Sequence, residues 1–247
     1  MDLFWTLPAT SRPPFLICVA QPTVYLPGPE LYQRYSERDP RVFRSGLDQL
    51  SKVIPFKPDE KIEWGQLRPA EDLGVAVGDM YAAERVTSFL AENHLRPQAR
   101  IGKDYSFEDL RSSPSVLIGA FNNRWSMQLI SKLRFQFVDS PGSVREEIPG
   151  GREWSANSNE NGQIIHDYAI VARLLDSETG QFTVVIGGLT AEGTQAAGEL
   201  VTNEDSLRVA LKSAPSGWEK KNVEIVIETN VTDLVASPPH VVASYFW

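Results

Sequence analysis

Short apolar runs alternate with helix-like segments along much of the chain. The runs "PFLICVA" (14–20) and "SVLIGAF" (115–121) contain no charged residue, which is typical of strands buried on both faces of a parallel sheet. Between them, "MYAAERVTSFLAENHL" (80–95) places apolar residues on one helical face. Strands and helices in this order favour right-handed crossovers. The sequence therefore predicts an α/β fold with a mixed, mainly parallel sheet flanked by helices.

Several further elements are predicted from local patterns. A strand over 73–79 ("LGVAVGD") leads into the helix at 80–95, and another helix is expected over 42–52. Ser106 precedes an apolar helical turn with Asp109 three residues later, which is the pattern of an N-cap. In the second half, "DYAIVARLLD" and "QFTVVIGGL" are joined by "SETG", which predicts a hairpin. A helix from about Thr194, a second from Asn203 or Asp205 through Ser213, and the strands "NVEIVIETNV" and "HVVASYFW" complete the prediction.

The size and composition indicate a folded globular protein. Of the 247 residues, 42% are hydrophobic and 23% are charged, which is an ordinary globular balance. We expect residues 1–247 to form a single α/β domain. The stretch 139–165 is rich in Gly, Pro, Ser and Asn, so it is either a surface loop or a junction between two lobes.

Charge and motifs argue against several classes of function. Acidic residues outnumber basic ones by 32 to 24, for a net charge of -8, and no basic stripe suits nucleic acid. No apolar run reaches the roughly 18 residues that span a bilayer, so we expect no membrane insertion. The single cysteine, Cys18, and three scattered histidines fit no metal or hydrolase motif. We expect no metal, no cofactor and no catalytic residues.

Polar residues and glycines follow the predicted strands. In open α/β sheets, ligands bind beyond the carboxyl ends of parallel strands, where helices begin. The residues found at these positions are the candidate ligand-binding set: Gln21, Asp79, Asn122, Asn123, Arg124, Trp125, Thr190, Gly193 and Thr194. We expect them to converge on one small polar or anionic ligand.

Each of these signals also has a purely structural explanation. Asn122 or Asn123 is either a ligand-binding amide or the N-cap of the following helix, with Arg124 a solvated residue in its first turn. The corner "VVIGGLTAEGT" (184–194) is either a backbone cradle for an anion or a tight turn with a cap. It lacks the lysine of a phosphate loop, which disfavours a nucleoside triphosphatase. In the turn-and-cap alternative, Gly198 allows the helix to pack closely. His166 and Asp167 are adjacent in a strand and point to opposite faces, so we expect no joint role.

Several sequence blocks resemble a domain known from acidobacterial proteins. These blocks are "SFEDLRSSPSVLIGAFNNRW", "DYAIVARLLDSETGQ", "GGLTAEGTQAAGEL", "GWEKKN" and "VVASYFW". In that family the domain lies C-terminal to a winged-helix region and a membrane segment, and no activity or catalytic residue is attached to it. The resemblance implies an extracytoplasmic domain of a membrane-anchored transcription regulator. The order of elements is also similar to that of two-lobed solute-binding folds, which bears on fold alone.

Two functions from different classes follow. The first is a non-catalytic, ligand-binding sensory domain for signal transduction, with its ligand at the strand ends. The alternative is a protein-interaction or oligomerisation domain, in which the polar strand ends are caps and exposed aromatic residues contact another subunit. An enzyme is the weaker third hypothesis.

Overall fold

The structure, a computed structural model, describes residues 2–5, 13–38, 59, 61–70, 73–139 and 142–247. The chain divides into two compact units, one made of Met1–Pro22 with Val75–Trp247 and the other of Thr23–Gly74. Residues 142–165, in the stretch predicted as a loop or lobe junction, lie inside the larger unit and contribute short strands to it. The helix predicted over 42–52 lies outside the described residues.

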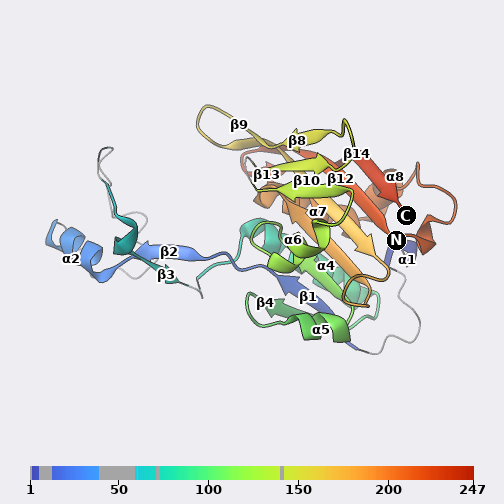
Figure 1. Ribbon diagram of the computed structural model, residues 1–247, viewed down its shortest axis with the longest axis horizontal. Coiled ribbons are helices and arrows are strands. Elements are labelled where there is room, and N and C mark those ends of the chain that lie inside the picture. Colours follow the sequence, from blue (N-terminus) through green and yellow to red (C-terminus); the bar gives the residue numbers. More distant parts are fainter. Residues whose placement is uncertain (1, 6–12, 39–58, 60, 71–72, 140–141) are drawn as a thin grey trace. The chain divides into compact units, whose positions relative to one another are not determined.

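A nine-stranded sheet forms the centre of the larger unit (Figure 1). Its strand order is β13-β12-β10-β11-β5-β1-β4, with β14 paired to β12 and β9 paired to β10. The strands are β1 (Phe15–Val19), β4 (Pro97–Ile101), β5 (Ser115–Ile118), β9 (Asn157–Ser158), β10 (Ile164–Leu174), β11 (Thr183–Gly188), β12 (Val223–Thr232), β13 (Val235–Ala236) and β14 (His240–Phe246).

The sheet is mixed, as predicted, but the prediction that it is mainly parallel is not confirmed. β4, β1, β5 and β11 run parallel to one another. β10 is antiparallel to β11, β12 and β9, and β12 is antiparallel to β13 and β14. Short connections, such as the turn between β10 and β11, join antiparallel strands, whereas parallel strands need a longer crossover. The fold is therefore α/β with a parallel region at one side of an otherwise antiparallel sheet.

Helices cover both faces of this sheet (Figure 1). The helical segments of the larger unit are α1 (Asp2–Trp5), α4 (Val77–Glu92), α5 (Phe107–Ser112), α6 (Arg124–Ile130), α7 (Ala191–Thr202), α8 (Glu204–Ala210) and the 3-10 helix η3 (Trp218–Lys220). The predicted cap at Ser106 is confirmed, since its hydroxyl accepts a hydrogen bond from the Asp109 N–H at 3.3 Å. The strand predicted over 73–79 is wrong, because α4 already begins at Val77.

Close packing of α4 on α7 explains that early start. A Cβ atom at Gly78, in the first turn of α4, would overlap with the carbonyl oxygen of Ala191. Further along, a Cβ atom at Gly198 would lie 2.7 Å from the Cα of Ala82. Glycine at these two positions lets the helix backbones approach each other. The expected role of Gly198 in close helix packing is confirmed.

The alternation of side chains along the strands builds two hydrophobic clusters. In β1, Ile17 and Val19 face the cluster that contains α4 and α7, while Leu16 and Cys18 face the cluster that contains α5 and α6. Successive strand residues point to opposite faces, so a strand that is apolar throughout fills both layers. Cys18 is fully buried, and burial raises the pKa of its thiol to about 12. It packs as a small apolar residue, as expected.

A second, three-stranded sheet lies on the α6 side of the larger unit. It consists of β6 (Phe135–Val138), β7 (Ser143–Glu146) and β8 (Glu153–Ser155) in antiparallel pairs. Glu146 accepts hydrogen bonds from Arg134 at 2.7 Å and Arg152 at 3.2 Å. Beneath this sheet, Glu224 of β12 is fully buried and accepts a hydrogen bond from the Phe135 N–H at 3.1 Å.

The described residues of the smaller unit form an antiparallel pair of strands, an α-helix and a 3-10 helix. β2 (Val24–Pro27) pairs antiparallel with β3 (Leu67–Ala70), next to the 3-10 helix η2 (Trp64–Gln66), and α2 spans Pro29–Arg38. Leu31 is fully buried against Ile62 and Leu67. On the surface, the Tyr25 and Trp64 rings are in contact, with centroids 4.6 Å apart and planes tilted by 50°.

Candidate functional site

The carboxyl ends of three parallel strands lie side by side at one edge of the sheet. The register pairs Val19 with Ile118 and Ile118 with Ile186, so β1 and β5 end level with each other and β11 continues past them to Gly188. Helices α4 and α7 begin at this same edge, since their first turns are in contact at Gly78 and Ala191. Side chains from distant parts of the sequence are thereby brought to one place.

Asp79 lies at the centre of this edge. Its side chain is 2% exposed, although it is a carboxyl group in the first turn of α4. The Asn122 Nδ2 donates a hydrogen bond to Asp79 Oδ2 at 2.8 Å. Burial raises the pKa of the Asp79 carboxyl to about 6, and the Asn122 amide and the nearby Thr194 hydroxyl oppose that shift. The Thr194 hydroxyl itself donates a hydrogen bond to the Thr190 carbonyl at 3.2 Å and accepts one from the Gly188 N–H at 2.9 Å. Three members of the predicted set, Asp79, Asn122 and Thr194, therefore meet.

The backbone after β5 passes directly beneath this group. Gly119 has a φ of +103°, a conformation that side-chain-bearing residues rarely adopt. A Cβ atom there would lie 2.5 Å from Asn122 Oδ1 and 3.1 Å from Asp79 Oδ2. Glycine at 119 is thus required both by the turn and by the space that the two polar side chains occupy.

The N-terminus of α7 is occupied by a carboxylate of the protein itself. Asp167 Oδ2 accepts hydrogen bonds from the Gly193 N–H at 2.6 Å and the Thr190 N–H at 3.2 Å. It also accepts a bond from the Thr190 hydroxyl at 2.5 Å, and that hydroxyl lies 2.7 Å from Glu192 Oε2. The anion attracted to this glycine-rich corner is an internal aspartate, so the turn-and-cap explanation describes the contacts of Thr190 and Gly193.

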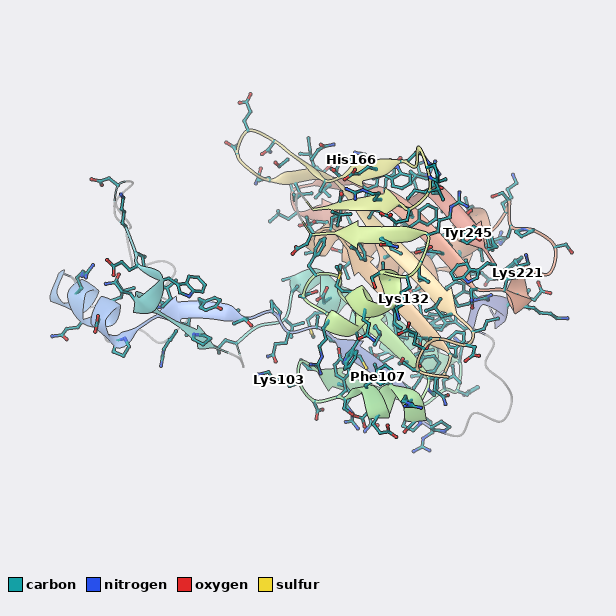
Figure 2. The ribbon with its side chains drawn as sticks, viewed as in Figure 1. Lys103, Phe107, Lys132, His166, Lys221 and Tyr245 are labelled. Carbon is teal, nitrogen blue, oxygen red and sulfur yellow. The ribbon has the colours of Figure 1, made fainter. Side chains whose placement is uncertain are left out.

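Other members of the predicted set have structural contacts. Asn123 is 2% exposed and caps α6, with its Oδ1 accepting from the N–H groups of Trp125 at 3.2 Å and Ser126 at 3.3 Å. Arg124 is exposed and its guanidinium carbon lies 4.5 Å from the Trp125 ring centroid. Trp125 in turn packs on Phe107, labelled in Figure 2, with ring centroids 5.1 Å apart.

Gln21 follows β1, and its side chain lies against Gly102, directly after the end of β4. A Cβ atom at Gly102, where φ is +60°, would overlap with the Gln21 amide oxygen. This glutamine is half-buried and extends the polar edge beyond β1.

Sequence reasoning missed a second polar group at the same edge, on the antiparallel strands. His166 Nε2 lies 3.4 Å from Glu228 Oε2, and the His166 ring packs on Tyr168 with centroids 4.9 Å apart (Figure 2 labels His166). His166 thus pairs with Glu228, while its neighbour Asp167 caps α7 on the other face, so the two are not used together. The pairing of β10 with β12 that creates this contact has no local sequence signal.

The chain matches no family model, no curated protein and no solved structure in the comparisons made. None of the helices in the described ranges is both long and apolar enough to cross a bilayer. Within the same ranges, no group of three or more His, Cys, Asp or Glu side chains is placed to hold a metal ion.

Proposed function

We propose that the larger unit is a non-catalytic binding module that takes a small polar ligand at the carboxyl ends of β1, β5 and β11. The observation that carries this proposal is the Asp79 carboxyl group, which is 2% exposed and accepts a hydrogen bond from the Asn122 amide, with no cation at ion-pair distance among the described residues. Burying a carboxyl group without a cationic partner costs free energy. Such costs are concentrated at functional sites.

The chemistry of the edge favours a ligand that donates hydrogen bonds. At neutral pH, above a pKa of about 6, Asp79 is mostly a carboxylate and accepts hydrogen bonds. The N–H groups at the start of α7, which would attract an anion, already bind Asp167. A hydroxyl, amide or ammonium group is therefore the better complement, and Asn122 and Gln21 can serve as mixed donors and acceptors. Of the two ligand classes expected from the sequence, polar and anionic, these contacts favour the polar one.

The wider role follows from the resemblance described above and is part of the same proposal. A binding module placed beyond a membrane segment and joined to a winged-helix region would act as an extracytoplasmic sensor. The affinity of the strand-end site for its ligand would then bias the state of the regulator.

The test is a ligand screen by thermal shift with the full chain and matched variants. The library contains polyols, amino-acid amides, amines and, as the contrasting arm, inorganic anions and carboxylates. A ligand that binds the folded state raises the melting temperature. We expect Asp79→Asn and Asn122→Ala to abolish that shift, and the exposed-site controls Asp104→Asn and Asn161→Ala to keep it. A shift that persists in both edge variants would refute this site.

A protein-interaction domain is the second candidate, and one feature favours it. Val77, Met80 and Tyr81, at the start of α4, are 67%, 47% and 52% exposed, which is a high exposure for three apolar residues on neighbouring turns. Sedimentation over a range of concentrations tests this alternative. Self-association that is lost in Tyr81→Ser, with no compound active in the screen, would favour it over the binding module.

A further inference from the structure

A cavity of about 420 Å³ lies at the opposite edge of the sheet from the strand-end site. It is lined by Leu3, Phe4, Glu204, Leu207, Arg208, Leu211, Lys212 and Trp218. Arg173 is in contact with Phe4 and Trp218, two residues of the lining. In the sheet, Arg173 pairs with Val184, near the start of β11. The strand-end site lies at the other end of β11, which is Gly188. The cavity is therefore separate from the residues of the proposed strand-end site.

The floor of the cavity is apolar. Phe4 and Leu207 are buried, and Leu211 and Trp218 are half-buried around the same space. Leu3 is 54% exposed, so an apolar side chain stands at the mouth. The size falls in the range of about 300 to 1,000 Å³ that small-molecule sites occupy, and mostly apolar walls with a few polar groups are typical of such sites.

The polar residues of the lining lie along one side of α8 and its C-terminal extension. Glu204, Arg208 and Lys212 are spaced four residues apart, which places them on one helical face. The Arg208 guanidinium forms an ion pair with Asp205. The Lys212 side chain is exposed, and its ammonium group has no hydrogen-bond or ion-pair partner among the residues that the structure describes. An ammonium group thus stands unpaired at the end of the cavity near Leu211.

A second cation lies behind the aromatic walls. The Arg173 side chain is fully buried, and its guanidinium carbon is 5.5 Å from the Phe4 ring centroid and 5.1 Å from that of Trp218. Its hydrogen bonds go to backbone carbonyls, including those of Leu3 at 3.0 Å and Trp218 at 2.9 Å, and its Nε is buried without a partner. No carboxylate in the described residues pairs with this guanidinium at ion-pair distance. The charge is stabilised by backbone dipoles and aromatic rings, and by the electrostatic influence of Glu219 from beyond ion-pair distance.

We propose that this cavity is a second ligand site that takes a small amphipathic carboxylate, with its apolar chain on Phe4, Leu207 and Trp218 and its carboxylate at Lys212. The apolar floor selects the chain. The unpaired Lys212 ammonium group selects a negative head group over a neutral or positive one, and the buried Arg173 guanidinium behind the wall adds to the positive potential. This site is independent of the strand-end proposal.

The test titrates the full chain with three probes that share one alkyl chain: octanoate, 1-octanol and octylammonium, each below its micelle concentration. Binding is measured by calorimetry. We expect octanoate to bind at least about tenfold more tightly than octanol, as one charge-assisted contact is worth roughly that factor, and octylammonium to bind more weakly still. Lys212→Gln should reduce octanoate affinity to that of octanol and leave octanol binding unchanged.

Matched variants keep the outcome decisive. Lys220→Gln removes the same charge from an exposed position outside the lining and should leave octanoate affinity within about twofold of the parent. Leu3→Glu places a negative charge at the mouth and should weaken octanoate binding without affecting the core. Equal affinity for octanoate and octanol, equal loss in both lysine variants, or no octanoate binding at millimolar concentration would each overturn the proposal.

Discussion

Glu224→Gln should make the larger unit more stable at neutral and alkaline pH. Burial raises the pKa of the Glu224 carboxyl from 4.5 to about 8, while hydrogen bonds from the backbone of Phe135 and Arg134 oppose the shift. One of its oxygens, Oε2, accepts the Phe135 N–H, and the other, Oε1, is buried without a partner. Glutamine has nearly the same shape as the protonated acid and cannot ionise. The difference in stability between wild type and Glu224→Gln therefore reports the cost of ionising Glu224.

The magnitude follows from proton linkage. A group whose pKa is raised on folding stabilises the fold fully below its unfolded pKa, and that stability is lost as the pH rises through the folded pKa. For Glu224 the window is pH 4.5 to about 8. One pKa unit corresponds to about 1.4 kcal/mol, so the wild-type free energy of unfolding should fall relative to Glu224→Gln by about 3 kcal/mol between pH 5 and pH 8.

The assay is urea unfolding at pH 5, 6, 7 and 8, followed by tryptophan fluorescence. Trp64 alone among the six tryptophans belongs to the smaller unit, so the signal reports mainly on the larger one. Glu160→Gln, in an exposed turn, is the control and should show no pH-dependent difference of this size. A difference between wild type and Glu224→Gln that stays constant within about 1 kcal/mol over the four pH values would refute the reasoning.

Three further changes test the packing and caps that hold the two edges. Asp167→Ala should lower the free energy of unfolding by about 2 to 4 kcal/mol, because it leaves the buried N–H of Gly193 without its 2.6 Å partner. Urea unfolding measures this loss, and a loss below about 0.5 kcal/mol would contradict the prediction. Gly198→Val should lower the free energy of unfolding by about 2 to 3 kcal/mol, because the larger side chain forces α7 away from Ala82. We expect the melting temperature to fall by several degrees, and an unchanged melting temperature would show that the helices can separate freely. Arg173→Met should lower the free energy of unfolding by about 2 kcal/mol, because it removes the donor to several backbone carbonyls. Amide hydrogen exchange at residues 218–221 should become faster, and unchanged exchange would mean that ring packing alone holds this segment.

Signals that act within a few residues were sufficient to predict much of the fold. The Ser106 cap, the helix after residue 80 and the hairpin between β10 and β11 each depend on neighbours in sequence. The strand assigned to 73–79 failed because residues 73–76 form no strand and α4 begins at Val77. The first turn of α4 is in contact with Ala191, more than a hundred residues away. Local hydrophobicity carries no record of such a contact.

Strand direction and partner choice were also beyond local reasoning. The central stretches of β10 ("AIVA", 169–172) and β12 ("IVI", 225–227) are as apolar as β5, so the composition of these stretches does not distinguish an antiparallel strand buried on both faces from a parallel one. The His166–Glu228 pair depends on the register of β10 against β12, which the sequence does not encode nearby. The place of Asn122 and Thr194 was predictable, because they follow β5 and β11 and parallel strands end at a common edge. Asp79 reaches the same edge from the first turn of α4 and follows no strand, so its place there does not come from that rule.

The glycine-rich corner at the start of α7 shows why a helix N-terminus is an ambiguous sign of ligand binding. Free N–H groups and glycine backbone attract a negative charge whatever its origin. Here that charge comes from Asp167, 26 residues before Gly193 in sequence and brought alongside by the β10–β11 hairpin. Asp167 already accepts hydrogen bonds from the N–H groups at the start of α7. The remaining charged acceptor at this edge is Asp79, which has no cation beside it in the described residues. A ligand at this edge would therefore be chosen by what it can donate to Asp79.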